Sequence, residues 1–168
     1  MNEPTLRALT PEDADAARAL LASRFAGTRY HARLEEQLET ALTFDDSEYS
    51  SLVAVDSTGV LLGVAVFGTL AGAQRCMKLH AFVGGDEGAM TAMARGVAEC
   101  AAMSAERLIV CELADDAPFS LASAVLQASG YEQEERVPDF FREGVALLIL
   151  VLRADFSLNR SSNPLLSH

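Results

Sequence analysis

The sequence predicts a single α/β domain, a mixed α+β arrangement in which a twisted, partly parallel sheet of about seven strands is flanked by about four helices. Three observations support this fold class. Apolar runs of strand length alternate with segments of helical periodicity. In the second half of the chain two helical segments each join two strands, as right-handed crossovers do. A polar strand, a turn and an apolar strand close the pattern as an antiparallel hairpin. One domain is also what 168 residues lead us to expect.

The N-terminal part predicts a short strand over 5–9 and then two helices. Thr10 is a strong helix start, because its hydroxyl can accept from the free backbone amides and Pro11 suits the first helical position. Apolar residues then repeat at helical spacing until Gly27 ends the helix. The second helix is expected over 29–42, with a row of glutamates on its solvated face.

The middle of the chain predicts three consecutive strands. The first two, 51–55 and 60–70, are separated by Asp56-Ser57-Thr58-Gly59, a turn signal. Both are almost continuously apolar, so we expect them to be buried on two faces. The third strand covers 74–83, and the glycine-rich segment 84–88 ends it.

The second half predicts a helix over 89–104, a strand over 107–113 and a helix over 117–129 that stops at Gly130. The closing hairpin follows over 131–153. Asp139 is expected to cap its turn, since aspartate and proline favour turns through local hydrogen bonding.

Composition excludes several classes of function. The net charge is −11 with one lysine, Lys78, so the clustered cations that bind nucleic acid are absent. The acidic balance suits a cationic partner and also serves solubility, and both interpretations stay open. The longest uncharged apolar stretch, 60–73, is too short to span a membrane.

The cysteines and the N-terminus predict a reduced, cytoplasmic protein. Cys76, Cys100 and Cys111 are odd in number and lack a C-x-x-C spacing, which argues against disulfides and against a metal site. No basic region followed by an apolar block marks a secretory signal at the N-terminus.

The closing hairpin resembles that of a known family. Gly130-Tyr131, then Asp139-Phe140-Phe141 and Gly144, then a buried strand resemble the C-terminal hairpin of the GNAT (Gcn5-related) N-acetyltransferases. The predicted order of elements is also similar, over a domain of residues 1–154 that a polar tail, 155–168, follows. The resemblance implies that the strands at 74–83 and 107–113 splay apart and that acetyl-CoA enters between them.

The resemblance also implies which residues bind acetyl-CoA. The strand backbone would hold the pantetheine arm, and amides at the start of the next helix would hold the pyrophosphate, as helix N-termini do. The implied contacts are Ala81, Phe82, Val83, Gly84, Gly85, Gly88, Ala89 and Met90.

The pyrophosphate loop departs from the family motif R/Q-x-x-G-x-G/A. With Gly88 as the first motif glycine, Gly85 takes the Arg/Gln place and Met90 the second Gly/Ala place. Asp86 and Glu87 stand where the pyrophosphate would approach. Two interpretations stay open: the acids only start the helix and the amides still hold CoA, or the loop has lost its anion site.

The resemblance and the residues together suggest the catalytic groups. Leu126 occupies the place of the family's proton-donating tyrosine, and leucine has no proton to donate. Candidates for the general base are Glu112, at the end of an apolar strand face beside the expected cleft, and His80, on the preceding strand.

The sequence therefore predicts an acyl-CoA-dependent N-acetyltransferase that uses acetyl-CoA to acetylate an amine by direct attack. The alternative is a catalytically inactive domain of the same fold that binds a ligand or a protein. A small amine or an N-terminal amine is the expected acceptor, with neither nucleic acid nor a membrane as partner. The identity of the acceptor, the acyl chain and a homodimeric state stay open.

Overall fold

The computed structural model describes residues 3–43 and 49–153, so the predicted tail at 155–168 lies outside the described residues. The helices are α1 (Ala14–Phe25), α2 (His31–Thr43), α3 (Glu87–Met103) and α4 (Ser120–Ala128), with short 3₁₀ turns at Pro11–Asp13 and Ala117–Phe119. The strands are β1 (Thr5–Arg7), β2 (Tyr49–Val55), β3 (Leu61–Thr69), β4 (Cys76–Gly84), β5 (Leu108–Ala114), β6 (Glu132–Arg142) and β7 (Val145–Arg153).

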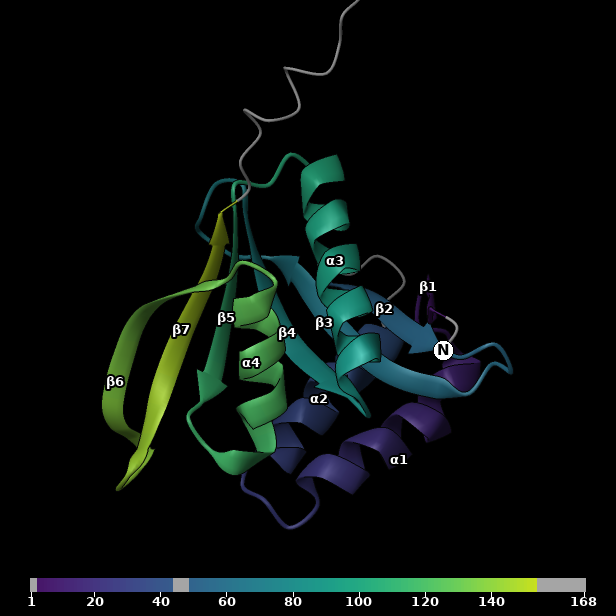
Figure 1. The fold of residues 1–168 in the computed structure, drawn as a ribbon, viewed down its shortest axis with the longest axis horizontal. Helices are drawn as coiled ribbons and strands as arrows, with labels where there is room; N and C mark the ends of the chain where they lie inside the picture. The colour runs from purple at the N-terminus through teal and green to yellow at the C-terminus, as the bar shows by residue number, and fades with distance from the viewer. Residues whose placement is uncertain (1–2, 44–48, 154–168) are drawn as a thin grey trace, which may run out of the picture.

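The seven strands form one sheet in the order β1-β2-β3-β4-β5-β7-β6. Helices α3 and α4 pack together on one face, and α1 and α2 pack together on the other (Figure 1). The predicted fold class is confirmed. The two helical crossovers differ, however: β4 and β5 pair in parallel, whereas β7 inserts between β5 and β6 and pairs antiparallel with both.

The sheet divides between β4 and β5. These strands pair only from Cys76 with Leu108 to Leu79 with Cys111. Beyond that point β4 stays with β3, and β5 stays with β7, up to their last residues. The split that the family resemblance implied is therefore present, and it leaves a strand edge without a partner on each side.

A β-bulge marks the point of divergence. Phe67 of β3 pairs with Leu79 and Val66 pairs with Ala81, so His80 is the extra residue on β4. A bulge bends its strand and redirects the side chain it carries. The bulge thus places His80 where β4 begins to leave β5.

The closing hairpin also forms as predicted. Asp139 has a left-handed backbone, with φ of 54°, and its carboxylate accepts from the Gly144 amide at 2.7 Å. Phe141 meets the ring of Tyr30 edge to face, with centroids 5.7 Å apart. This contact brings the turn of the hairpin against the start of α2.

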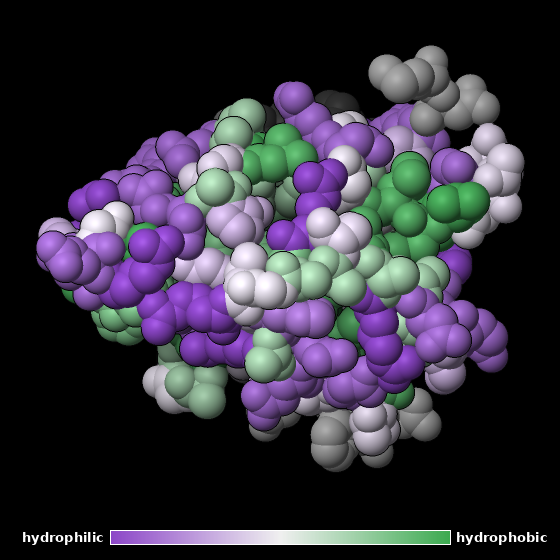
Figure 2. Space-filling model, turned by 90° about the horizontal axis from the view of Figure 1, so that it is seen from below, coloured by the Kyte–Doolittle hydropathy of each residue, from purple (hydrophilic) through white to green (hydrophobic). Residues whose placement is uncertain are grey.

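The face of the molecule that is seen from below is largely polar. Seen from below, most of the surface is hydrophilic, and hydrophobic residues gather in separate patches (Figure 2). Among the described residues no helix is long and apolar enough to cross a membrane. Within the same residues, no group of three or more potential ligands is arranged to hold a metal ion, and the three cysteines are unpaired.

Candidate active site at the split in the sheet

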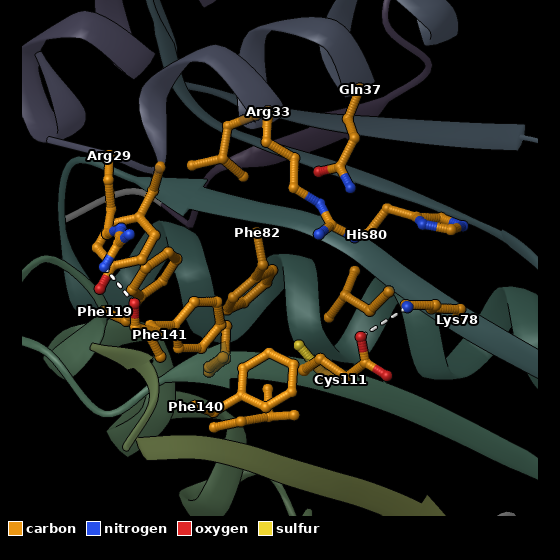
Figure 3. A pocket seen from close by; sticks show the side chains of 17 residues that line it. Arg29, Arg33, Gln37, Lys78, His80, Phe82, Cys111, Phe119, Phe140 and Phe141 are labelled. Atoms are coloured by element: carbon orange, nitrogen blue, oxygen red, sulfur yellow. Dashed lines mark hydrogen bonds and ion pairs between the residues drawn. The ribbon is translucent and has the colours of Figure 1, made fainter. Parts of the chain in front are cut away.

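A cavity of about 570 Å³ opens beside the split, on the side of the sheet that α2 covers. Its walls come from α2, from β4 and β5 around the point where they diverge, and from the turn of the β6–β7 hairpin (Figure 3). A volume of this size holds a small molecule. Both predicted base residues, His80 and Glu112, line this cavity, so the structure brings them together.

Glu112 forms an ion pair with a lysine side chain inside the cavity. Its carboxylate accepts from the Lys78 ammonium at 2.8 Å, across the gap between β5 and β4. Glu112 thus holds Lys78 in an ion pair that the sequence did not indicate, and its role as a base stays a prediction.

His80 is a neutral imidazole at pH 7. Burial, together with the nearby charges of Lys78 and Arg33, lowers its pKa to about 4. Its ring also lies against Tyr49, with centroids 4.8 Å apart. One ring nitrogen of a neutral imidazole is free to accept a proton or a hydrogen bond.

The lowered pKa of His80 predicts a specific acid sensitivity. The unfolded chain takes up a proton at this histidine as the pH falls from 6.5 to about 4, whereas the folded protein does not. We expect this site to cost about 1 kcal/mol of unfolding free energy over that window, after allowance for the partial exposure of the ring. His80→Gln should lose correspondingly less stability between the two pH values. Urea unfolding of both proteins at each pH measures the difference, and equal losses would contradict the buried neutral histidine.

Three further polar side chains on α2 and its start line the same cavity and were missed at the sequence level: Arg29, Arg33 and Gln37. Arg29 donates to the carbonyl of Phe141 in the hairpin turn. Gln37 has a buried side-chain oxygen without a hydrogen-bond partner within the part of the chain that the structure describes. Helical periodicity predicted the apolar face of α2 and its row of glutamates. The sequence carried no signal for what Arg29, Arg33 and Gln37 contact.

The residues predicted to bind acetyl-CoA lie along one path. Ala81, Phe82, Val83 and Gly84 form the end of β4 beyond its last pairing with β5. Gly85 and Gly88 lie in an exposed segment, and Ala89 and Met90 are buried in the first turns of α3. Their role in binding stays a prediction.

Asp86 caps α3, which begins at Glu87, two residues earlier than predicted. The Asp86 carboxylate accepts from the Ala89 amide at 2.8 Å. A side chain of this protein therefore already occupies one of the amides that a helix N-terminus offers to a phosphate. Asp86 is therefore a helix-start residue, and the binding of CoA at this loop stays a prediction.

The empty space between this loop and the end of β4 is small. A void of only about 20 Å³ lies between the end of β4, Phe25 of α1 and the start of α4. Met90 packs against Gly84 so closely that a side chain at Gly84 would collide with it. Phe25 also meets Phe119 beside this void, with ring centroids 5.0 Å apart.

Arg24 supplies a cation that the loop itself lacks. Its guanidinium reaches from the end of α1 and donates to the carbonyl of Gly85. Arg24 also lines the narrow void beside Gly84 and Met90. Arg24 thus places a positive charge beside the loop, although it comes from a distant part of the chain.

Comparison with known proteins gives a fold and no close relative. No protein-family model and no curated protein matches the sequence. Solved structures do match, among them a GCN5-related N-acetyltransferase from Kribbella flavida, with 16% identity, a TM-score of 0.72 and coverage of 90% of this chain and 98% of that one.

Two further matches are enzymes whose acceptors are named. An aminoglycoside 6′-N-acetyltransferase from Enterococcus faecium shares 13% identity, with a TM-score of 0.71 over 89% of this chain and 96% of its own. A mutant spermidine/spermine N-acetyltransferase from Vibrio cholerae shares 17% identity, with a TM-score of 0.67 over 95% and 99%. The divided seven-stranded sheet of this chain is the fold of the GNAT acetyltransferases.

Proposed function

We propose that the protein is an acyl-CoA-dependent N-acyltransferase with acetyl-CoA as its cosubstrate and a small amine as acceptor. The observation that carries this proposal is the split between β4 and β5, which opens onto a cavity lined by His80 and Glu112. The free edge of β4 beyond Leu79 fits the arm of a thioester, because unpaired backbone groups of a strand edge are ready hydrogen-bond partners.

The chain's own residues have distinct roles in this proposal. Acetyl-CoA supplies the acyl group as a thioester. Amides at the β4 edge would polarise the carbonyl that the amine attacks. His80 would accept the proton that the amine loses, because it lines the cavity and a neutral imidazole has a free ring nitrogen, although a pKa of about 4 makes it a weak base. Lys78 would hold the carboxylate of Glu112 in place.

A second function is favoured by a different set of contacts. The Asp86 carboxylate accepts from the Ala89 amide, and the void beside the end of β4 has a volume of only about 20 Å³. Leu126, which replaces the family's proton donor, is fully buried. These observations support a domain of the GNAT fold that binds a ligand without transferring an acyl group.

Titration of the purified chain with CoA, acetyl-CoA and longer acyl-CoAs separates the two functions. An acyltransferase should bind acetyl-CoA with about micromolar affinity, show a raised melting temperature and release free thiol when an acceptor amine is added. A binding module should release none. The absence of heat, of a melting shift and of thiol release would reject the acyltransferase.

A further inference from the structure

The cavity beside the split carries the opposite charge to the protein as a whole. The chain has a net charge of −11, yet Arg29, Arg33 and Lys78 line the cavity with Glu112 as the one lining carboxylate among the described residues. Lys78 neutralises Glu112. The two arginines are left as the local excess, so the cavity favours an anionic group although the distant field favours a cation.

Arg33 is the arginine available to a ligand. Its guanidinium points from α2 into the cavity toward His80 (Figure 3), and its charge lowers the pKa of that histidine. No carboxylate within the described ranges, 3–43 and 49–153, forms an ion pair with it. Arginine binds carboxylates through two parallel hydrogen bonds, which makes a carboxylate the fitting partner for this planar group.

Gln37 lies one helical turn after Arg33 and faces the same cavity. Its side-chain oxygen is buried and lacks a donor among the described residues. A buried acceptor without a partner is costly, so a ligand that brings an N–H donor to this point gains a favourable interaction. Arg33 and Gln37 line the same cavity, so a ligand that carries both a carboxylate and an amine, as an amino acid does, offers a partner to each of them.

The other half of the cavity is aromatic. The rings of Phe82, Phe119, Phe140 and Phe141 gather below α2, on the far side of the cavity from Gln37 (Figure 3). Phe140 is 58% exposed at the hairpin turn and meets Phe141 edge to face at 5.0 Å. An exposed phenylalanine at the rim of a cavity offers apolar surface that a ligand can cover.

We propose that this cavity binds a small compound that joins a carboxylate and an amine to an aromatic or large aliphatic body, as an apolar α-amino acid does. The carboxylate meets Arg33, the amine meets Gln37 and the apolar body lies among the four phenylalanines. This inference rests on the proposed function for one point only: if the protein transfers an acyl group, this amine is the acceptor.

Binding of matched probes to the full chain, in the absence of any acyl-CoA, tests the pocket. L-phenylalanine should raise the melting temperature and give heat in a titration. L-phenylalaninamide lacks the carboxylate, glycine lacks the ring and spermidine lacks both, so each should bind at least about tenfold more weakly. Equal or tighter binding of spermidine or of the amide, or no binding of L-phenylalanine, overturns the proposal.

Variants locate the binding. Arg33→Gln should weaken the binding of L-phenylalanine about tenfold or more and leave the preference of the pocket for a ring over glycine intact. Phe140→Ala, at an exposed position, should also weaken it. Arg95→Gln is the matched control, because Arg95 lies on α3 across the sheet and pairs with Glu3 at 3.1 Å. An unchanged affinity in Arg33→Gln, or an equal loss in Arg95→Gln, overturns the assignment.

Failure of this inference and failure of the proposed function look different. Specific binding of L-phenylalanine without thiol release from acetyl-CoA would support the pocket and reject the acyltransferase. Thiol release with spermidine, together with no binding of L-phenylalanine, would support the acyltransferase and overturn the pocket.

Discussion

Replacement of Leu126 by alanine is expected to lower the free energy of unfolding by about 3 kcal/mol, because it removes three heavy atoms from a closed part of the core. Leu126 has no exposed surface. It lies near the end of α4, where its carbonyl accepts from the amide of Tyr131 at 3.0 Å. Tyr131 is itself buried, so the end of α4 and the start of the hairpin are tightly packed. We therefore expect these segments to move little into the cavity that the alanine would leave. Chemical denaturation with urea measures the loss.

A volume-conserving replacement provides the control for this prediction. Leu126→Met should cost less than about 1.5 kcal/mol, because methionine fills a similar volume and adapts to an irregular space. Similar stability of the alanine and methionine variants would show that the site collapses and that Leu126 is not a core position. If the large loss is found, the residue in the place of the family's proton donor serves packing here. Proton transfer to a leaving thiolate would then come from solvent or from another side chain.

Local sequence signals account for the elements that the sequence predicted well. Each helix signal in the sequence affects only its immediate neighbours along the chain. Helices therefore begin or end close to the places predicted from Thr10-Pro11, Gly27 and Gly130. Asp139 holds its turn by a bond to an amide five residues away. Such contacts depend on backbone geometry that neighbouring residues determine, and a single sequence displays them directly.

The split and the cavity depend on contacts between distant residues. Periodicity predicted two helical crossovers but not that β7 inserts beside β5, because hairpin and crossover patterns do not state which edge a strand joins. Only the family resemblance predicted the split between β4 and β5. Arg24 meets Gly85 across 61 positions, and Arg29 meets Phe141 across 112. No local pattern marks an arginine for such a contact, so the polar side of the cavity appears only once the fold is known.

Asparagine in place of Asp86 is expected to tighten the binding of CoA by about tenfold. At a separation of about 6 Å and an effective dielectric near 20, the Asp86 carboxylate and one phosphate charge repel by about 3 kcal/mol. Asp86 is exposed, so solvent and salt reduce this figure to about 1.4 kcal/mol, or tenfold in affinity. Asparagine keeps a side-chain oxygen that can accept from the Ala89 amide, so α3 should stay capped. Titration calorimetry with CoA at low and high salt measures the effect, which should shrink as salt rises.

Two matched variants separate the position of the charge from its removal. Glu132→Gln changes the net charge by the same amount at an exposed site on β6, on the edge of the sheet, and should leave the CoA affinity unchanged. Asp86→Ala removes the charge and the cap together, so α3 should lose about 1 kcal/mol of stability while its amides become free. Tighter binding by both Asp86 variants would show that the helix start receives the pyrophosphate and that the native carboxylate weakens it. If neither variant differs from the native chain, the phosphates do not approach α3, and the amides at this helix start serve only to cap it.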